Sequence, residues 1–360
     1  MAERKEAPHS RVQSTYKARE VEGVLDLYFY RPIGFRLAEW FAQLKMTPAS
    51  VSLLAGVSGV IAGHLYYYRD LRVNIVGMVL HVCSNALDNA DGQLARLTQT
   101  ESRKGRVIDS VADHLVFLSI YLNLVLRCLA EGFSPAIWCL ALAAGISHAL
   151  QGAAADYFRS TYLCFVSNGA RAGMDSSAGL RSEYRSWSWR QRPWDKLLLA
   201  LYLNFTRQQE MLAPRLKQLR GTASELFQSQ IPGWLEQRYR DSTGQMFKWW
   251  GLLMTNSRML ILFALLFIGQ PVYYFWFELI PLNLLFVYLL IRQEKMAESL
   301  LEFVARNRSR NPDRLPICAA GENENALGGD GSPRPSLPFG GDGRVSASES
   351  KGVGLGEGEG

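Results

Sequence analysis

Cysteine is sparse in this 360-residue sequence, with five residues in all. None of them forms a C-x-x-C pair, the spacing typical of zinc and redox sites. Four of the five lie in or beside apolar segments, where a cysteine usually acts as a small hydrophobic residue. We therefore expect neither a disulfide framework nor a zinc site.

Both ends of the sequence lack apolar character. Residues 1–20 are polar and charged and contain no apolar core, so we expect no cleavable signal peptide. We expect residues 1–23 to be flexible. Residues 307–360 are rich in Gly, Pro, Ser, Asp and Glu and show no apolar periodicity. This composition predicts a disordered tail without chemistry of its own. No internal repeat is visible.

The average hydropathy hides strong alternation along the chain. The hydrophobic fraction is 48% and the mean hydropathy is −0.04, as in an ordinary soluble protein. However, several apolar blocks reach the length of about 20 residues that crosses a bilayer. We therefore predict an all-α integral membrane protein with six transmembrane helices. They are expected at 51–68, 73–97, 105–129, 134–166, 246–269 and from Pro271 to about 291.

Two segments outside these spans are also predicted to be helical. Residues 24–44 mix aromatic and aliphatic side chains with charged ones, a pattern typical of an amphipathic helix at a membrane surface. A surface helix of a soluble domain is the alternative, but the position just before a span favours the interface. An insert rich in Arg and Trp, about 167–245, follows the fourth span and predicts a small helical subdomain or a membrane-surface hairpin. The whole membrane domain is expected to span 24–306.

Charge predicts the orientation. The net charge is +6, and in a membrane protein a basic balance indicates cytoplasmic loops facing anionic lipids rather than nucleic-acid binding. The insert, the connector 96–106 and the C-terminal flank hold most of the Lys and Arg. We therefore expect both termini on the cytoplasmic side of a bacterial-type inner membrane.

Four aspartates form the most informative pattern. Asp88 and Asp91 are spaced i,i+3, and Asp109 and Asp113 are spaced i,i+4, so each pair lies on one face of its helix. Two neighbouring helices could aim these carboxylates at one point. Because carboxylates at membrane depth are costly and repel one another, cations between them are expected. An all-oxygen set suits Mg²⁺ or Mn²⁺.

The aspartates belong to a longer motif, D-x2-D-G-x2-A-R-x8-G-x3-D-x3-D, which resembles the signature of the CDP-alcohol phosphotransferase (CDP-alcohol phosphatidyltransferase) family. Its positions here are Asp88, Asp91, Gly92, Ala95, Arg96, Gly105, Asp109 and Asp113. The resemblance extends more weakly over residues 24–300, without the insert or the tail. Packing of transmembrane helices through small residues explains the glycines and the alanine singly, but not four aspartates in register with them.

The resemblance implies transfer of a substituted phosphoryl group from a CDP-alcohol, often CDP-diacylglycerol, to an acceptor alcohol, with release of CMP. It implies that Asp88, Asp91, Asp109 and Asp113 bind two Mg²⁺ or Mn²⁺ ions, and that Asp113 also acts as the general base. The donor is expected to bind over Gly92, Ala95, Arg96 and Gly105. We also interpret Gly105 as a close contact between the second and third spans. Family members resemble homodimers.

The acceptor site is less clear in the sequence. Arg159 and Arg258 lie near the cytoplasmic ends of their spans and are candidates to bind an acceptor phosphate, although snorkelling arginines are common there. They favour a phosphorylated polyol such as glycerol phosphate or inositol phosphate. Asp156 is expected to pair with Arg159. The three histidines in the spans are expected to pack or form hydrogen bonds rather than bind metal; they are His81, His114 and His148.

Three other functions remain to be weighed. Transfer from a small CDP-alcohol to a lipid acceptor would use the same motif. A membrane prenyltransferase also uses aspartates and Mg²⁺, but its acidic spacing is absent here. A cation transporter is the non-enzyme alternative, yet the sequence has one acidic cluster and no matching second half.

Overall fold

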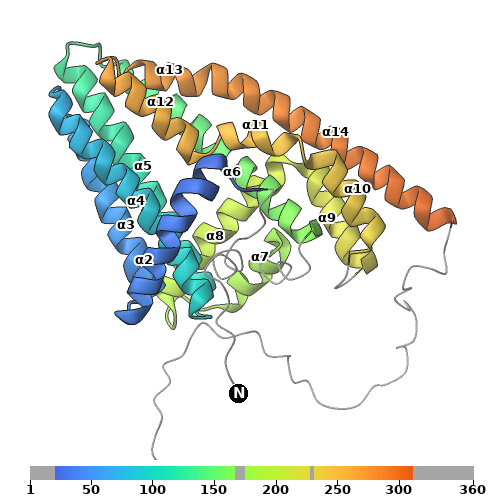
Figure 1. The fold of residues 1–360 in the computed structure, drawn as a ribbon. Coiled ribbons are helices and arrows are strands. Elements are labelled where there is room, and N and C mark those ends of the chain that lie inside the picture. Colours follow the sequence, from blue (N-terminus) through green and yellow to red (C-terminus); the bar gives the residue numbers. More distant parts are fainter. Residues whose placement is uncertain (1–20, 167–174, 228–230, 311–360) are drawn as a thin grey trace, which may run out of the picture. The chain divides into compact units, whose positions relative to one another are not determined.

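The computed structural model describes residues 21–166, 175–227 and 231–310, and all regular elements in these ranges are helices (Figure 1). Residues 1–20 and 311–360, where flexible ends were expected, lie outside the described residues. The first elements are η2 (Asp26–Tyr30), α2 (Arg31–Gln43), α3 (Pro48–Leu65), α4 (Leu71–Leu97), α5 (Arg103–Ala130) and α6 (Ile137–Val166). The last are α11 (Met246–Leu252), α12 (Thr255–Phe267), α13 (Tyr273–Leu279) and α14 (Pro281–Arg310).

The insert is helical, as predicted. It forms α7 (Ser177–Ser186), α8 (Pro193–Leu212), α9 (Pro214–Phe227) and α10 (Gly233–Thr243). The apolar side chains of α9 and α10 share one hydrophobic core with α6 and α14. Glu294 of α14 also accepts hydrogen bonds from the backbone N–H groups of Arg215 and Leu216, at 2.8 and 3.3 Å, and so caps α9. The insert is therefore joined to the rest of the molecule rather than forming a separate subdomain.

A buried carboxylate holds α7 to α8 and α9. Glu210 of α8 accepts hydrogen bonds from the backbone N–H and the hydroxyl of Ser177, at 2.9 and 2.6 Å. The ammonium group of Lys217 lies 2.6 Å from the same carboxylate. Burial alone would raise the pKa of Glu210, but the hydrogen bonds from Lys217 and Ser177 outweigh it and hold this pKa below its usual range.

Polar side chains cap the N-termini of α3, α4 and α5 and so fix where these helices begin. The Thr47 hydroxyl accepts from the backbone N–H of Ser50 and caps α3. Asp70 caps α4 in the same way, and Ser102 accepts from the N–H of Gly105 at 3.0 Å to cap α5. Because α5 begins at residue 103, Asp109 falls in its second turn.

Four helices are long and apolar enough to cross a membrane. They are Pro48–Leu65, Lys104–Ala130, Ile137–Val166 and Tyr273–Asn307, and α11 with α12 would form a fifth span if the two are counted together. The structure thus supports an all-helical fold with four or five of the predicted spans, and the sixth stays a prediction. The missing span is α4, which has 27 residues but carries the charged motif residues that lower its hydropathy. Residues 31–43 are helical as expected, but their place at a membrane surface stays a prediction.

The predicted fifth span is broken. The axes of α11 and α12 are bent by 44°. At the break, the Ser257 hydroxyl donates to the Gly251 carbonyl at 3.2 Å, and Arg258 Nε donates to the Leu253 carbonyl at 3.1 Å. These side chains satisfy backbone groups that the interrupted helix leaves open, which makes the bend acceptable at membrane depth.

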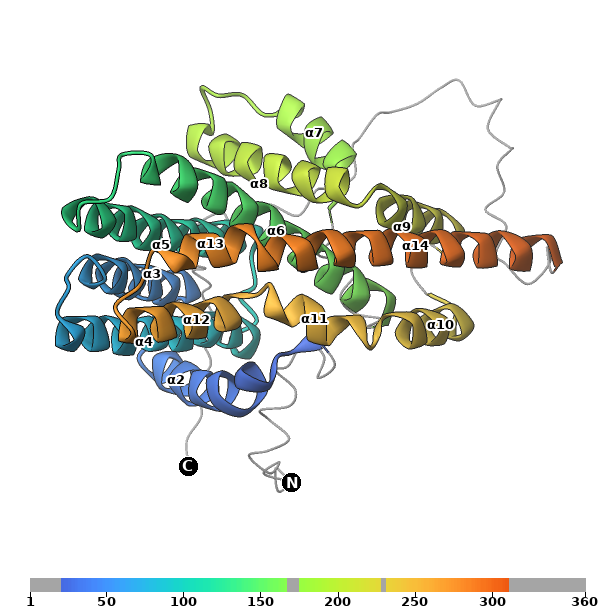
Figure 2. The same ribbon diagram turned by 90° about the horizontal axis from the view of Figure 1, so that it is seen from above.

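Helix α3 lies between α4 and α5 and packs closely against both, whereas α4 and α5 make few contacts with each other (Figure 2). The reason is a row of glycines on α3. A Cβ atom at Gly59 would lie 2.5 Å from Val116 Cγ2 of α5 and 2.8 Å from Ser84 Oγ of α4. A Cβ atom at Gly63 would lie 2.8 Å from the backbone N of Ile120. The position of α5 relative to α4 is therefore determined by α3.

Candidate metal and substrate site

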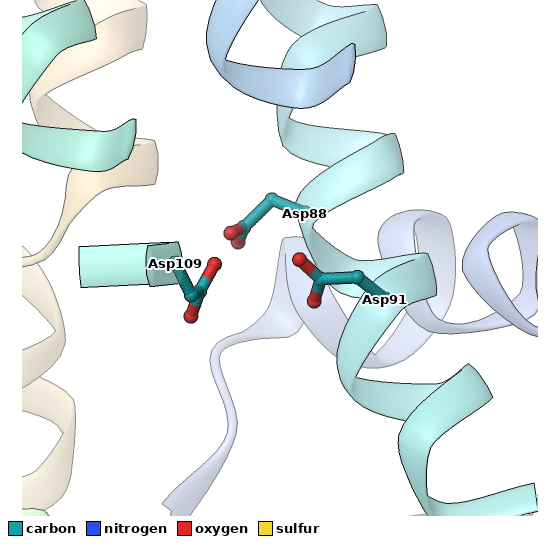
Figure 3. Close-up of side chains that lie close together, drawn as sticks. All are labelled: Asp88, Asp91 and Asp109. Carbon is teal, nitrogen blue, oxygen red and sulfur yellow. The ribbon is translucent and has the colours of Figure 1, made fainter. Parts of the chain in front are cut away.

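Three carboxylates meet across the space between α4 and α5. Asp88 and Asp91 of α4 and Asp109 of α5 each offer one oxygen atom, and these oxygens all lie within 4.8 Å of one another. Figure 3 shows the three side chains pointing toward a common point. A set made only of carboxylate oxygens fits a hard divalent cation such as Mg²⁺ or Mn²⁺. The structure therefore brings together the residues that the spacing of the motif singled out.

Asp113 lies beside this group, one turn further along α5 than Asp109. Its carboxylate is close enough to interact electrostatically with Asp88, Asp91 and Asp109. It is not one of the three residues whose oxygens come within 4.8 Å of one another. The arrangement thus separates a compact set of three ligands from a fourth carboxylate at its edge.

A serine from α3 holds one of the metal-site carboxylates. The Ser52 hydroxyl donates a hydrogen bond to Asp91 Oδ2, and both residues are buried. The bond fixes the Asp91 side chain and leaves its other oxygen for a ligand. Ser52 Oγ also lies 3.1 Å from the Pro48 carbonyl, the ordinary partner of a serine in a helix. The sequence analysis missed Ser52 because nothing in the local sequence indicates a second partner 39 residues away.

The small residues of the motif leave the face of α4 open. A Cβ atom at Gly92 would meet only the Arg96 guanidinium, at 3.5 Å. The Arg96 side chain folds back toward this glycine, and its buried Nε has no hydrogen-bond partner. Ala95 is half-buried on the same helix. Space and an available donor therefore lie together next to the aspartates.

Our interpretation of Gly105 as a close contact between the second and third spans is wrong. A Cβ atom there would meet only the Ser102 hydroxyl, at 3.1 Å, which belongs to the cap of the same helix. Helices α4 and α5 meet through α3 instead, so Gly105 leaves the first turn of α5 open rather than filled.

The two candidate acceptor arginines occupy different surroundings. Arg159 Nη2 lies 3.6 Å from Glu22. The expected pairing of Arg159 with Asp156 is wrong, because Asp156 accepts a hydrogen bond from Gln209 at 3.0 Å. Arg159 is half-buried, and its Nε has no hydrogen-bond partner.

Arg258 is buried inside the helical bundle. It forms an ion pair with Glu278 of α13, and its Nη2 donates to Gln151 Oε1 of α6 at 2.7 Å. Among the residues that the structure describes, no ion pair joins Arg258 to the four aspartates. Its guanidinium is thus engaged in a network that links three helices.

The histidines form hydrogen bonds within the bundle, as expected. His81 lies 3.2 Å from the Tyr66 hydroxyl, and His148 lies 3.3 Å from the Tyr121 hydroxyl. His114 Nδ1 lies 2.6 Å from the Ser110 carbonyl of the same helix. None of the three belongs to the carboxylate group at the metal site described above.

The described residues form a helical protein with apolar helices long enough to cross a membrane, and three carboxylates that could hold a metal ion lie between α4 and α5. Residues 45–159 match the family model of the CDP-alcohol phosphatidyltransferases. This segment covers α3, α4, α5 and most of α6, and it contains all eight motif positions. The chain therefore carries a CDP-alcohol phosphatidyltransferase domain, and the predicted resemblance is confirmed. No curated protein matches the chain.

The family match bears on the class of reaction, the metal and the membrane location. Members of this family transfer a substituted phosphate group from a CDP-alcohol to an alcohol acceptor, and the match over residues 45–159 supports a transferase of this class. Such enzymes typically use a divalent metal, and the group of Asp88, Asp91 and Asp109 fits one. The apolar helices agree with an integral membrane protein.

Proposed function

We propose that this protein transfers a phosphatidyl group from CDP-diacylglycerol to the hydroxyl of a phosphorylated polyol, with release of CMP, in phospholipid biosynthesis. The observation that carries the proposal is the convergence of Asp88, Asp91 and Asp109 from α4 and α5 within the segment that matches the family. Glycerol phosphate and inositol phosphate are the acceptors that we favour.

The reaction needs charge neutralisation and removal of one proton. The acceptor oxygen attacks the phosphorus that bears the alcohol, and the bond from this phosphorus to the oxygen of CMP breaks. Bound divalent cations, two in our proposal, would neutralise the pyrophosphate and the leaving CMP. Asp88, Asp91 and Asp109 would hold them, with Asp113 at their edge. In this proposal Asp113 would also take the proton of the acceptor hydroxyl.

Donor binding is assigned to the open face of the motif. Gly92 and Ala95 leave room for the nucleotide beside α4, and Arg96 can donate to its phosphates. Gly105 leaves the first turn of α5 accessible from the same side in this proposal. The contribution of these residues is to position the donor against the aspartates.

Of the two acceptor candidates, Arg159 is the better placed. Its Nε has no hydrogen-bond partner, and its side chain is partly exposed. Arg258 is engaged with Glu278 and Gln151, so a role in acceptor binding would require the loss of these contacts. In this proposal Arg258 therefore mainly holds helices of the bundle together.

In the membrane we propose six spans, with α4 as the second and with residues 24–44 at the interface. The 27 residues of α4 would extend about 40 Å, enough to cross the bilayer. The distribution of Lys and Arg favours a cytoplasmic location for the aspartates and both termini in a bacterial-type inner membrane. We also expect a homodimer, as the family resemblance implies.

Release of CMP tests the proposed function. Purified protein would be incubated with Mg²⁺ or Mn²⁺ and with CDP-diacylglycerol plus one of several acceptors: glycerol phosphate, inositol phosphate, inositol, serine or none. A parallel series would use a small CDP-alcohol as the donor and a lipid alcohol as the acceptor. We expect CMP only with a phosphorylated polyol. Release only from a small CDP-alcohol with a lipid acceptor would replace the proposal with the aminoalcohol-type reaction. Absence of CMP with every donor and acceptor would refute the enzyme and leave a cation transporter as the alternative.

Two aspartate variants sharpen this test. Asp113→Asn should abolish CMP release while Mn²⁺ binding is retained, because it removes the proposed base but leaves the three closest ligands. Asp156→Asn is the matched control, since Asp156 lies on α6 and bonds to Gln209. A near wild-type rate in Asp113→Asn would exclude Asp113 as the base.

A further inference from the structure

A buried carboxylate from the N-terminal segment joins two arginines that are far apart in the sequence. Glu22 accepts hydrogen bonds from Nε and Nη2 of Arg31, both at 2.6 Å, and lies 3.6 Å from Nη2 of Arg159. The Glu22 side chain is fully buried, and that of Arg31 is 8% exposed. The carboxylate thus occupies the position between a guanidinium of α2 and one of α6.

This contact borders the metal site. The backbone carbonyl of Arg31 accepts a hydrogen bond from Gln93 Nε2 at 3.1 Å, two residues after Asp91 on α4. Arg96 interacts electrostatically with Arg31, Glu22 and Asp91. Glu22 therefore links three arginines, of which Arg96 borders the aspartates, and we refer to Arg31, Arg96 and Arg159 as the arginine cluster.

The arginine cluster contains buried donors that its protein partners leave unsatisfied. Glu22 is the acid that forms ion pairs with it among the described residues, and Asp91 and Glu101 also act electrostatically on Arg96. The Nε atoms of Arg96 and Arg159 are buried without hydrogen-bond partners. Buried donors without acceptors are costly, so this arrangement favours an added anion.

The geometry suits a phosphate better than a second carboxylate. Guanidinium groups bind phosphate oxygens in forked pairs, and Arg31 and Arg159 approach the position of Glu22 from two helices. A phosphomonoester carries about −1.5 to −2 charges at neutral pH, so it attracts these guanidinium groups more strongly than the single charge of a carboxylate does.

We propose that Arg31 and Arg159 of the arginine cluster bind the phosphomonoester of the acceptor, next to Arg96 at the donor phosphates, and that Glu22 occupies this position when no phosphorylated ligand is present. This inference rests on the proposed function and deepens it. It requires an acceptor that carries a phosphate, and it identifies the Glu22 carboxylate as the group that competes with this phosphate for the arginines. Binding exchanges the Glu22 carboxylate for the phosphate at Arg31 and Arg159. The Glu22 carboxylate moves away from the two arginines as the acceptor enters.

Thermal unfolding of the full-length protein in detergent tests the proposal, with a chelator present and no CDP-alcohol. Glycerol phosphate is titrated into wild type and Glu22→Gln, with glycerol as the unphosphorylated control. Without ligand, Glu22→Gln should be less stable, because it leaves buried arginines uncompensated. With glycerol phosphate, its apparent Kd should be roughly tenfold lower than that of wild type, since the competing carboxylate is gone.

Matched variants separate the proposal from a purely structural ion pair. Glu131→Gln removes a carboxylate that pairs with Arg69 and Arg127 instead, and should leave the Kd for glycerol phosphate unchanged. Arg159→Gln should abolish stabilisation by glycerol phosphate; this variant keeps the contact between Glu22 and Arg31 and serves if Glu22→Gln does not fold. Stabilisation of neither protein by glycerol phosphate, or an equal Kd in both, would overturn the proposal.

Two further arms identify the ligand and separate this test from that of the overall function. If soluble CDP-ethanolamine, rather than glycerol phosphate, binds more tightly to Glu22→Gln, the cluster holds the donor pyrophosphate and the acceptor assignment is wrong. Because metal and CDP-diacylglycerol are absent, failure of CMP release leaves this binding result unaffected. Where CMP is released, Glu22→Gln should lower the KM for glycerol phosphate, and an unchanged KM would contradict the exchange.

Discussion

Gly59 of α3 is the position where a single methyl group should disturb the metal site from a distance. A Cβ atom there would lie 2.5 Å from Val116 Cγ2 and 2.8 Å from Ser84 Oγ. Neither neighbour can yield easily, because valine is stiff about χ1 and the Ser84 hydroxyl bonds to the Ala55 carbonyl at 2.7 Å. Gly59→Ala should therefore push α4 and α5 away from α3.

The magnitude follows from two opposing effects. Overpacking a tight contact costs about 1–3 kcal/mol, whereas alanine is favoured over glycine within a helix by about 1 kcal/mol. Gly152→Ala on α6 isolates the second effect, because a Cβ atom there meets nothing within 4 Å. The free energy of unfolding of Gly59→Ala should therefore lie about 1–3 kcal/mol below that of Gly152→Ala.

Unfolding in mixed micelles of detergent and denaturing detergent, followed by tryptophan fluorescence, measures this difference. A Mn²⁺ titration of the folded variants measures the consequence for the site, since the carboxylates of α4 and α5 are held in place through α3. We expect weaker Mn²⁺ binding in Gly59→Ala and wild-type binding in Gly152→Ala. Equal stability and equal Mn²⁺ affinity of the two variants would refute the idea that α3 spaces the metal ligands.

Three other changes test separate parts of the structure. Arg258→Ala should lower the free energy of unfolding by about 3–5 kcal/mol in the same micelle assay, because Glu278 is left buried and unpaired; a loss below about 1 kcal/mol would contradict this. Ser52→Ala should weaken Mn²⁺ binding about 10–100-fold by releasing a metal-ligand carboxylate, and unchanged affinity would argue against this positioning role. Lys217 and Ser177 donate hydrogen bonds to Glu210 and lower its pKa, so they stabilise the fold in full at pH values above the pKa of this group in the unfolded chain. This stabilisation is lost as the pH falls through the lower pKa of the folded state. The difference in melting temperature between wild type and Glu210→Gln should therefore shrink below about pH 4, and a constant difference would be inconsistent with the pKa shift.

The positions of most helices could be predicted because their ends carry local signals. Thr47, Asp70 and Ser102 are standard capping residues at the start of apolar blocks, and the helices begin next to them. The bend between α11 and α12 could not be predicted, because it depends on side chains that satisfy carbonyls at the break. The last helix was also expected to end near residue 291, yet α14 runs to Arg310 because its charged half packs against the insert.

The same division applies to the site. The four aspartates were recognisable because their spacing places them on helix faces, and the structure brings the carboxylates of Asp88, Asp91 and Asp109 together with Asp113 beside them. Ser52 and Glu22 contact site residues through the tertiary fold, and no short-range pattern identifies such partners. The role of Gly105 in packing was wrong for a related reason, because a glycine in a motif does not reveal which helix it faces.

Helix α14 has 30 residues and would extend about 45 Å. Its first half carries exposed apolar side chains, including Leu284 and Val287, whereas its second half caps and contacts the insert helices. A helix is a stiff rod on this scale, so its two halves cannot reorient independently. If the bilayer becomes thinner and α14 tilts to match it, α9 must move as well. Bilayer thickness thereby becomes mechanically linked to the polar half of the molecule.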